Sequence, residues 1–493
     1  MISQVLFGYM GFASWVLVGF LLLLLIDVVR NWRPRNFPPG PWAVPFIGNI
    51  FTGLDFKTME KLAQEHGPVF SLRIGSKRMV FVSGYKMVKE ALLNRLDSFN
   101  DRPVFPLLHV VFKGLGLSLS NGYLWKKQRK FANTHLRYFE EGQKSLEKYI
   151  EVESNFICEA FKDEQGQPFN PHYTINSAVS NVISCVVFGH RFEYSDPTYR
   201  KILELDSEIF VLAGAFQTQL YDVFPGLMKY LPGPHHTVLA NYAKIIKFLS
   251  NQIQRHQEAW NPDNPRDYID VYLSEMDKKK SDPKAGFNIE NLQICTIDLI
   301  EAGTETTATT LRWGLVFMMN YPHIQEKVQA EIDRVIGQSR QPTMADRSNL
   351  PYTDAVIHEV QRVGNIAPLG FPRMASKDTT LGGYFIPKGT STTTILSSVL
   401  NDKNEWETPD SFNPEHFLDS NGQFRRREAF FPFSAGTRVC LGENLAKMEL
   451  FLFFTSLLQR FTFRPVPGEM PSLEGVMGFT HSPKAFRTLA VPR

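Results

Sequence analysis

Most of the chain has an apolar residue at roughly every third or fourth position, a period that predicts helices. Residues 69–84, VFSLRIGSKRMVFVSG, instead alternate apolar and polar positions and predict a hairpin with Gly75 and Ser76 in its turn. Further strand-like stretches are residues 381–396 and the segment after Phe461. The predicted helices cover 123–139, 171–188, 235–260, 290–336, 352–363 and 443–460. Because strands gather near the two ends of the sequence, without regular strand–helix alternation, we predict a mainly helical α+β fold.

The N-terminal segment is apolar throughout. Residues 1–26 contain no charged side chain, and this stretch exceeds the ~20 apolar residues that a bilayer-spanning helix needs. No signal-peptide cleavage site follows it. Arg30, Arg33 and Arg35 come directly afterwards, so the positive-inside rule places the rest of the protein in the cytosol. We therefore expect residues 1–29 to form a single transmembrane anchor.

The remaining chain divides into a short strap and one large domain. Residues 30–50 are basic and rich in proline, which fixes the backbone and predicts a stiff, extended connection. Neither a linker nor a repeat interrupts residues 51–493, so one domain is expected. The net charge of +3 is too small to suggest a nucleic-acid partner. The four cysteines lack paired spacing, which argues against disulfides and zinc sites and fits a reducing compartment.

Two familiar catalytic patterns are present only in broken form. In KGLGLSLSNG, residues 113–122, Leu119 stands where a dinucleotide-binding loop needs its third glycine. In IHEVQR, residues 357–362, Arg362 replaces the second histidine of a zinc-protease helix. The chain therefore has no evident nucleotide or zinc site of its own.

The stretch FSAGTRVCLGE, residues 433–443, surrounds Cys440 with glycines. Gly436 and Gly442 allow a tight backbone bend, and the helix expected just beyond would stabilise a thiolate through its N-terminal amides. Phe433 offers an apolar wall, and Arg438 can project toward another anion. Plain packing explains the other cysteines better than this one. Two chemical readings remain open at this point: a thiolate nucleophile, or a thiolate ligand to haem iron.

A second unusual stretch is IDLIEAGTETTATTLRWG, residues 297–314, where glycine and threonines interrupt a helical pattern. At about 100° per residue, Asp298, Ala302 and Thr306 share one side of the helix. Ala302 would leave space above a flat ring, Thr306 would offer a hydroxyl to a reacting oxygen, and Glu305 could refill a proton chain from solvent. The plainer reading is a threonine bonded back to the carbonyl four residues earlier.

Together these motifs resemble the cytochrome P-450 (haem-thiolate monooxygenase) superfamily, in its vertebrate microsomal, family 2-like branch that oxidises drugs and fatty acids. Residues 433–442 match F-x-x-G-x-R-x-C-x-G in full, and residues 302–307 match A-G-x-[DE]-T-T. Glu359 and Arg362 match the E-x-x-R pair. The resemblance covers essentially the whole chain and implies a single large cytochrome P-450 fold, with haem between a long threonine-containing helix and the cysteine loop.

The resemblance also implies roles for individual residues. Cys440 would be the axial ligand of the iron in haem b, with Phe433 beside it. Thr306 and Glu305 would be the catalytic pair. The residues that would contact the haem propionates are Trp125, Arg129, Arg438, Arg102 and Arg373.

The Glu359–Arg362 pair would be structural. The family often completes it with the arginine of P-E-R-F, but this chain has PEHF, so His416 takes that place. Histidine cannot form a forked pair of hydrogen bonds, so we predict a somewhat softer lock. Glu301 lies roughly 140° around the helix from Thr306. We expect it to be a buried, paired carboxylate away from the iron.

The implied reaction inserts one oxygen atom of O2 into a lipophilic substrate: a xenobiotic, a polyunsaturated fatty acid such as arachidonate, or a steroid. Electrons would come from NADPH through a flavoprotein reductase, in some relatives with cytochrome b5. The protein would lie in the endoplasmic reticulum membrane with its catalytic domain in the cytosol. The expected pocket walls include Leu108, Leu119, Ala302, Ile366 and Leu369.

A basic face near the cysteine is a candidate for docking the reductase. Its residues are Lys126, Lys127, Lys130, Arg425, Arg426, Arg427 and Lys447. Two other functions stay open from the sequence: a membrane-anchored Cys-dependent hydrolase or acyltransferase that uses Cys440, and a non-catalytic haem carrier or sensor.

Overall fold

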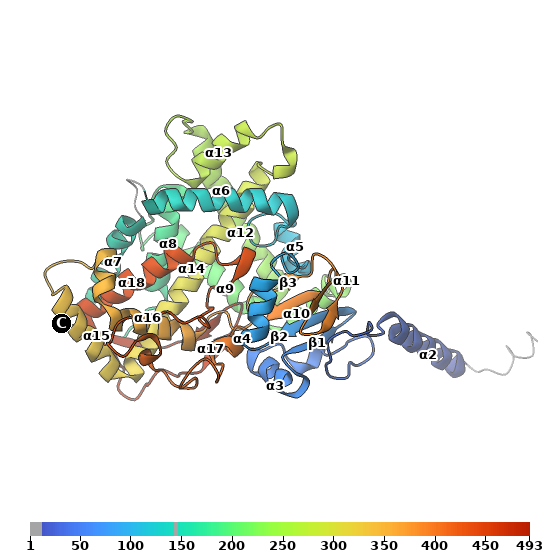
Figure 1. Cartoon of the computed structure of the whole chain (residues 1–493). Coiled ribbons are helices and arrows are strands. Elements are labelled where there is room, and N and C mark those ends of the chain that lie inside the picture. The colour runs from blue at the N-terminus through green and yellow to red at the C-terminus, as the bar shows by residue number, and fades with distance from the viewer. Residues whose placement is uncertain (1–11, 142–145) are drawn as a thin grey trace, which may run out of the picture.

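The computed structural model describes residues 12–141 and 146–493, and helices form most of it (Figure 1). The helices are α2 (Phe12–Arg30), α3 (Phe56–His66), α4 (Tyr85–Lys89), α5 (Pro106–Phe112), α6 (Gly122–Glu141), α7 (Leu146–Asp163), α8 (His172–Phe188), α9 (Pro197–Ala213), α10 (Phe216–Val223), α11 (Pro225–Met228), α12 (Pro234–Glu258), α13 (Tyr268–Lys278), α14 (Ile289–Asn320), α15 (Pro322–Val335), α16 (Pro351–Gly364), α17 (Ser397–Leu400) and α18 (Glu443–Arg460).

Short helical turns and strands complete the chain. The turns are η1 (Ile50–Thr52), η2 (Glu90–Asn94), η3 (Pro283–Ala285), η4 (Met344–Asn349), η5 (Pro414–Phe417) and η6 (Gly436–Arg438). The strands are β1 (Val69–Ile74), β2 (Lys77–Val82), β3 (Arg373–Met374), β4 (Thr379–Leu381), β5 (Tyr384–Ile386), β6 (Ser391–Thr394), β7 (Phe461–Pro465), β8 (Gly475–Met477), β9 (His481–Pro483) and β10 (Thr488–Pro492). The predicted mainly helical α+β class is confirmed.

Helix α14 runs through the centre of the molecule (Figure 1). It begins where the Asn288 side chain accepts a hydrogen bond from the Asn291 amide at 2.9 Å. The sequence pattern predicts one helix over 290–336, but α14 ends at Asn320 and α15 starts at Pro322. Proline lacks an N–H and clashes with the preceding turn, so the helix stops there although the apolar period continues.

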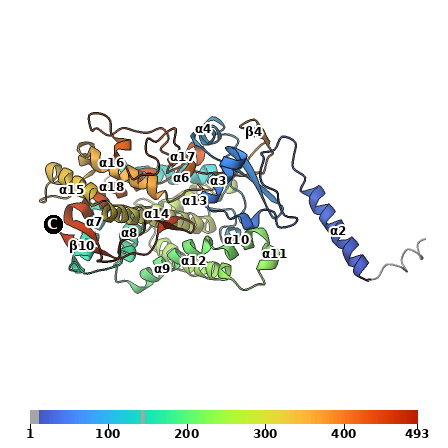
Figure 2. The same cartoon turned by 90° about the horizontal axis from the view of Figure 1, so that it is seen from below.

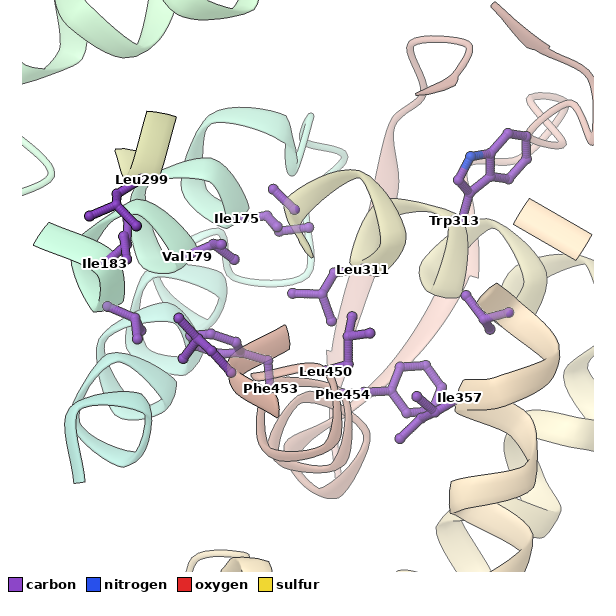
Figure 3. Packing of buried hydrophobic residues seen from close by; sticks show 14 of the residues in the cluster. Ile175, Val179, Ile183, Leu299, Leu311, Trp313, Ile357, Leu450, Phe453 and Phe454 are labelled. Carbon is purple, nitrogen blue, oxygen red and sulfur yellow. The ribbon is translucent and has the colours of Figure 1, made fainter. Parts of the chain in front are cut away.

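The core joins α8, α14, α16 and α18 (Figure 3). Ile175, Val179 and Ile183 lie on one face of α8 and are buried, and Phe453 of α18 is fully buried in the same cluster. Each such side chain contributes about 1.5–3 kcal/mol of burial free energy. A Cβ at Gly303 of α14 would lie 3.0 Å from Cγ1 of Ile183. Close packing of α8 on α14 therefore accounts for this glycine within the helix.

The largest sheet joins distant parts of the sequence. Strands β1 and β2 are antiparallel with Ile74 opposite Lys77, so Gly75 and Ser76 form the turn, as predicted. Strand β6 pairs in parallel with β2, and β3 pairs with β6, which gives the order β1-β2-β6-β3. The predicted stretch 381–396 becomes β5, β6 and the end of β4, and the segment after Phe461 becomes β7 paired with β10. This sheet stands at one end of the helical core (Figure 1).

The N-terminal part projects from the body as α2, followed by the strap (Figure 2). The strap runs beside β1, where the Ser71 amide donates to the Pro39 carbonyl at 2.7 Å. Part of the predicted anchor, residues 1–29, lies outside the described residues because the description starts at residue 12. Within the described ranges, we find no helix with the length and apolar character needed to cross a membrane.

Candidate active site

The cysteine loop connects η6 to α18, the helix that begins at Glu443. The Cys440 amide donates to the Phe433 carbonyl at 3.1 Å and closes the loop. Gly436 has φ +78°, and a Cβ there would collide with the Leu92 carbonyl oxygen at 2.2 Å, so glycine is required. Gly442 has φ −93°, and a Cβ there would meet no described atom within 4 Å. The geometry therefore requires glycine at position 436 and does not require it at position 442.

The Cys440 thiol is exposed, yet it is also desolvated by protein around it. The two observations fit a sulfur that faces an internal space. Burial raises the pKa of this thiol, while the Gly442 amide and Arg129 act in the opposite direction. The amide at the start of α18 thus lowers the pKa of the thiol as predicted, but burial raises this pKa by more. A metal cation bonded to the sulfur would supply the remaining stabilisation of the thiolate.

Four arginines from distant parts of the chain form one cluster near this loop: Arg102, Arg129, Arg373 and Arg438. Burial lowers the pKa of all four guanidinium groups, and repulsion from neighbouring guanidinium groups lowers it further in all except Arg129. In the part of the chain that the structure describes, none of them has a carboxylate within the 4.0 Å of an ion pair. Buried cations without counter-ions are costly, so the cluster calls for an anion from outside the chain.

Backbone carbonyls hold these guanidinium groups in place. Arg102 donates to the Phe371 and Pro372 carbonyls at 2.8 and 2.7 Å. The other bonds run from Arg129 to the Val439 carbonyl at 2.5 Å, from Arg373 to the Ala435 carbonyl at 2.7 Å, and from Arg438 to the Asn100 and Ser120 carbonyls, both at 2.8 Å. These bonds hold each guanidinium group in a fixed direction.

Trp125 and Arg438 each retain an unused donor. Nε1 of Trp125 and Nη1 of Arg438 are buried and have no hydrogen-bond partner among the described residues. Buried polar groups in proteins are nearly always satisfied. These two N–H groups therefore suit the same external anion as the arginine cluster.

Thr306 and Ala302 lie on a side of α14 that other parts of the protein do not fully cover. Ala302 is exposed although it sits in the middle of a long central helix, and Thr306 is half-buried. The Thr306 hydroxyl donates to the Ala302 carbonyl at 2.7 Å. The predicted alternative, a threonine bonded back to the carbonyl four residues earlier, is therefore confirmed. The hydroxyl oxygen still has lone pairs to accept a second hydrogen bond.

Glu305 does not have the solvent contact that we predict from the sequence. It is buried, its Oε1 atom lies 3.1 Å from Nη2 of Arg312, and it accepts a bond from the Thr309 hydroxyl at 2.7 Å. Arg312 lies seven residues later on the same helix, close to two full turns, which brings the charges together. The Oε2 atom has no partner in the described chain.

Comparison with known proteins identifies the family. The family described as Cytochrome P450 matches residues 38–489. Cytochrome P450 2J2 of Homo sapiens is 52% identical over 475 residues, which cover 96% of this chain and 94% of that protein. Cytochrome P450 2J1 of Oryctolagus cuniculus is 51% identical over 469 residues, 94% of this chain and 93% of that protein. Cytochrome P450 2H2 of Gallus gallus is 44% identical over 462 residues, 93% of this chain and 94% of that protein.

The chain belongs to the cytochrome P450 family. It is a family 2-like vertebrate P450, and it is an oxidoreductase of the monooxygenase type. Its cofactor is haem b, used with O2 and NADPH-derived electrons. This excludes the Cys-dependent hydrolase and the non-catalytic carrier that the sequence leaves open. The unpaired donors of Trp125 and Arg438, the arginine cluster and the inward-facing Cys440 sulfur fit a haem with anionic propionates.

The structural lock of this P450 is fully buried. Arg362 donates to both Glu359 oxygens, with Nε at 2.8 Å and Nη2 at 2.7 Å. His416 Nδ1 lies 3.2 Å from Glu359 Oε1, and the Thr408 amide donates to His416 Nε2 at 3.2 Å. An amide can only donate, so Nε2 accepts and Nδ1 carries the proton to Glu359. The guanidinium of Arg362 also donates to the carbonyls of Leu400, Pro409 and Ser411.

The predicted wall residues Leu108, Leu119, Ile366 and Leu369 are all half-buried against the cores. Their contact with a substrate stays a prediction. The structure also contains an aromatic row, of which the sequence reasoning missed Phe479: the ring centroids of Phe371 and Phe479 are 5.8 Å apart. The row continues to Phe105 on one side and to Phe210 on the other. Phe479 precedes a short strand without a clear apolar period, so no sequence signal marks it.

Part of the predicted basic face is engaged within the protein. Arg425 and Arg427 both pair with Glu407, at 3.2 and 2.9 Å, and Lys447 pairs with Glu443 at 2.5 Å. Lys126, Lys130 and Arg426 are exposed. The available positive charge is therefore smaller than the sequence suggests.

Proposed function

We propose that this P450 is a membrane-anchored monooxygenase of lipophilic substrates. One oxygen atom of O2 enters the substrate and the other leaves as water, with electrons from NADPH delivered by a flavoprotein reductase. The substrate classes are xenobiotics, polyunsaturated fatty acids such as arachidonate, and steroids. The observation that carries the proposal is the arginine cluster without carboxylate partners, three members buried and Arg129 half-buried, beside the inward-facing Cys440 thiol.

Haem would be held by residues of the cysteine loop and the arginine cluster. Cys440 would bind its iron, and the propionates would accept bonds from Trp125 and the arginine cluster. The haem supplies the activation of O2 when it is bound. Because these donors already point along directions fixed by backbone carbonyls, they would bind the propionates with little reorganisation.

Thr306 would handle protons on the open side of α14. Its Oγ1 proton rests on the Ala302 carbonyl at 2.7 Å, and rotation of the hydroxyl would direct it to an oxygen reacting on the open side of α14. Glu305, which directly precedes Thr306 on α14, would exchange protons within the protein. Its Oε2 atom, buried and unpartnered, is the atom available to receive or return a proton.

Membrane attachment is supported by exposed apolar surface. Side chains of α2 from Trp15 to Val29 are largely exposed. Further exposed apolar side chains are those of Trp42, Phe46, Phe51, Phe216, Leu227 and Tyr230, and the rings of Phe51 and Phe216 are neighbours. Exposed patches of this kind mark interaction with a membrane or a partner. We place the protein in the endoplasmic reticulum membrane, with the catalytic domain in the cytosol and the reductase, with cytochrome b5 as a second donor, docking near Lys126, Lys130 and Arg426.

The proposal is tested with the full-length protein in phospholipid vesicles. We expect the reduced, carbon-monoxide-bound protein to have the strongly red-shifted Soret band of thiolate-ligated haem, and NADPH plus reductase to yield oxygenated products from a lipid and drug panel by mass spectrometry. Cys440→Ser should abolish both signals, whereas Cys185→Ala, a buried cysteine far along the chain, should retain them. An unshifted band in the unmodified protein, or intact spectrum and turnover in Cys440→Ser, would refute the proposal.

A further inference from the structure

Helix α2, the proposed membrane anchor, carries an acidic side chain one turn before its end, at Asp27. Carboxylates are rare in apolar, membrane-inserted helices and are almost always paired where they occur. The Asp27 side chain is 10% exposed, whereas most apolar side chains of the same helix are largely exposed. Because α2 projects from the body (Figure 2), the segments that cover Asp27 are those that join the helix to the domain.

Both oxygens of the Asp27 carboxylate are occupied. Oδ2 lies 3.0 Å from Nη1 of Arg73 in β1 and accepts a hydrogen bond from the Phe46 amide at 3.1 Å. Oδ1 accepts a bond from Nδ2 of Asn31, one turn later in the chain, at 2.8 Å. The Arg73 side chain is 7% exposed, and its Nη2 donates to the Val44 carbonyl at 2.6 Å. Since each charge is covered, removing either one would leave the other without its counter-ion.

The backbone at Phe46 is strained in a way that serves this contact. Its φ of +63° lies in the left-handed region, which bulky L residues rarely adopt. The Ile47 amide donates to the Pro45 carbonyl at 2.8 Å across this residue, which gives a tight three-residue turn. Strained backbone persists where the surrounding contacts maintain it, and it often marks a functional position. Here the turn directs the Phe46 amide to Asp27 and leaves the Phe46 ring 40% exposed.

The strap between α2 and β1 is fastened to β1 at several points. The Ser71 hydroxyl of β1 donates to the Pro38 carbonyl at 2.8 Å. Gly40 packs so closely on β1 that a Cβ there would collide with the Ser71 carbonyl oxygen. Further along, Nδ2 of Asn49 donates to the Trp42 carbonyl and its Oδ1 accepts a bond from a β1 amide, at 2.8 and 2.9 Å. The strap is therefore a fixed part of the domain and not a free linker.

Two further elements hold the chain where it leaves α2. Arg78 of β2 donates to the Asn31 carbonyl, directly after the helix end. Nδ2 of Asn36 donates to the Gly383 carbonyl at 2.9 Å, and the Phe385 amide donates to the Asn36 carbonyl at 2.8 Å. Gly383 and Phe385 belong to the β4–β5 hairpin. Strand β2 and this hairpin thus add to the contacts that β1 makes.

We propose that the Asp27–Arg73 ion pair fixes α2 at one angle to the catalytic domain, and that this joint sets how the domain lies on the phospholipid bilayer. The inference rests on the membrane attachment in the proposed function and extends it from a tether to a rigid mount. Trp42 and Phe46, which stand in the same fastened segment, are 77% and 40% exposed. Aromatic side chains favour the interfacial layer of a membrane, so a fixed joint would hold these two rings at that layer. A domain that swivels freely about α2 is the alternative.

The test uses the haem-loaded, full-length protein in phosphatidylcholine nanodiscs. Nitroxide labels are placed on Leu22→Cys in α2 and Lys61→Cys in α3, both at exposed positions, and double electron–electron resonance measures the distance between them. We expect one narrow distance distribution in the protein with the natural joint. Asp27→Asn and Arg73→Gln should each widen it about twofold or more, because both lose the ion pair.

The matched control is Asp97→Asn, the same change at an exposed position, which should leave the distribution unchanged. A second readout is a single label on Trp42→Cys. Its accessibility to a water-soluble nickel chelate should rise about twofold or more when Asp27→Asn releases the joint, because the segment is no longer held at the interfacial layer. The red-shifted carbon-monoxide band, recorded on every sample, shows that the variants keep their haem-bound fold.

A distribution that is already broad with the natural joint, or that keeps its width in Asp27→Asn and Arg73→Gln, would overturn the rigid mount. A wider distribution with unchanged accessibility at Trp42→Cys would overturn the role of the joint in placing the domain on the bilayer. Flotation of the unmodified protein with phosphatidylcholine vesicles separates this inference from the proposed function. If the protein floats and the distribution is broad, only the joint fails, and if it does not float, the membrane attachment itself fails.

Discussion

The guanidinium of Arg438 stacks on the indole of Trp125, with Cζ of the arginine 3.6 Å from the ring centroid. Two carbonyls, those of Asn100 and Ser120, hold the same guanidinium from its other N–H groups. The stacking and the carbonyl bonds leave Nε1 of Trp125 and Nη1 of Arg438 without a described acceptor. The pair is therefore built to offer two donors side by side to an anion, and Trp125 both orients Arg438 and donates itself.

Trp125→Phe should weaken haem retention by about 1.5–3 kcal/mol, because a hydrogen bond to a charged group is lost while most of the aromatic stacking is kept. Haem transfer to an acceptor protein, followed by absorbance, measures the change in dissociation rate. Trp32→Phe, at an exposed position, is the matched control. Equal rates for the two variants would contradict a role for the Trp125 indole in holding the propionate.

Thr306→Ala should uncouple electron use from product formation. Without the hydroxyl, proton delivery on the open side of α14 fails, and more of the NADPH consumed appears as hydrogen peroxide, with product yield falling about tenfold or more. The ratio of product, peroxide and NADPH measures this. Thr310→Ala removes a hydroxyl one turn away, bonded to the Thr306 carbonyl, and should leave coupling near that of the unmodified protein. Unchanged coupling in Thr306→Ala would show that this hydroxyl moves no essential proton.

Arg362→Lys should destabilise the folded protein by about 3 kcal/mol or more. Lysine keeps the charge but cannot donate at once to Glu359 and to the carbonyls of Leu400, Pro409 and Ser411. The yield of haem-loaded protein and its denaturation midpoint measure the loss. Arg334→Lys is the control, because Arg334 pairs with Glu331 at the same spacing but its side chain is 72% exposed. If Arg362→Lys and Arg334→Lys had equal denaturation midpoints, the forked hydrogen bonds of Arg362 would contribute little to the stability of the folded protein.

His416→Leu should lower stability by about 1–3 kcal/mol, since Glu359 loses a buried donor and the Thr408 amide loses its acceptor. His416→Arg should bind haem at least as firmly as the natural histidine, because arginine supplies a forked donor to Glu359. Thermal denaturation of the haem-loaded proteins measures both. A destabilised His416→Arg would contradict the predicted softness of the histidine lock.

Stability should fall below about pH 6.5 through His172. Burial, followed by the charge of Arg312, lowers its pKa to about 4, so the folded protein resists a proton that the unfolded chain accepts below its ordinary pKa of 6.5. The loss grows as the pH falls from 6.5 toward 4 and reaches about 2 kcal/mol at pH 5. Urea denaturation at pH 7 and pH 5 measures it, and His172→Gln should lose this part of the pH dependence. His323→Gln, at an exposed position, is the control. An identical pH slope in His172→Gln would contradict the assignment.

The sequence predicts local features of this fold better than distant ones. The hairpin turn at Gly75 and Ser76 and the start of α18 follow from alternation and spacing close along the chain. Helices α7, α9 and α13 go unpredicted, although each buries apolar residues along one face and carries a helical apolar period. The break before α15 is missed because the apolar period continues across Pro322.

The functional residues likewise fall into those that short motifs predict and those that only the folded chain brings together. Cys440, Thr306 and Glu359 stand in compact motifs that the sequence displays directly. The clustering of the four arginines depends on loops that bring residues 102 and 438 together, and sequence spacing alone does not contain that information. The ion pair of Glu305 with Arg312 was also missed, since a helix places them on one face but does not say which face meets solvent.

The sheet order has a consequence for biosynthesis. Met79 of β2 pairs with Ser391 of β6 in parallel, and that partner is translated more than three hundred residues later. The N-terminal hairpin therefore leaves the ribosome long before its neighbouring strand exists, and β2 keeps an unpaired edge in the meantime. Nascent chains halted before residue 391 should bind chaperones through that edge, and release should coincide with the emergence of β6.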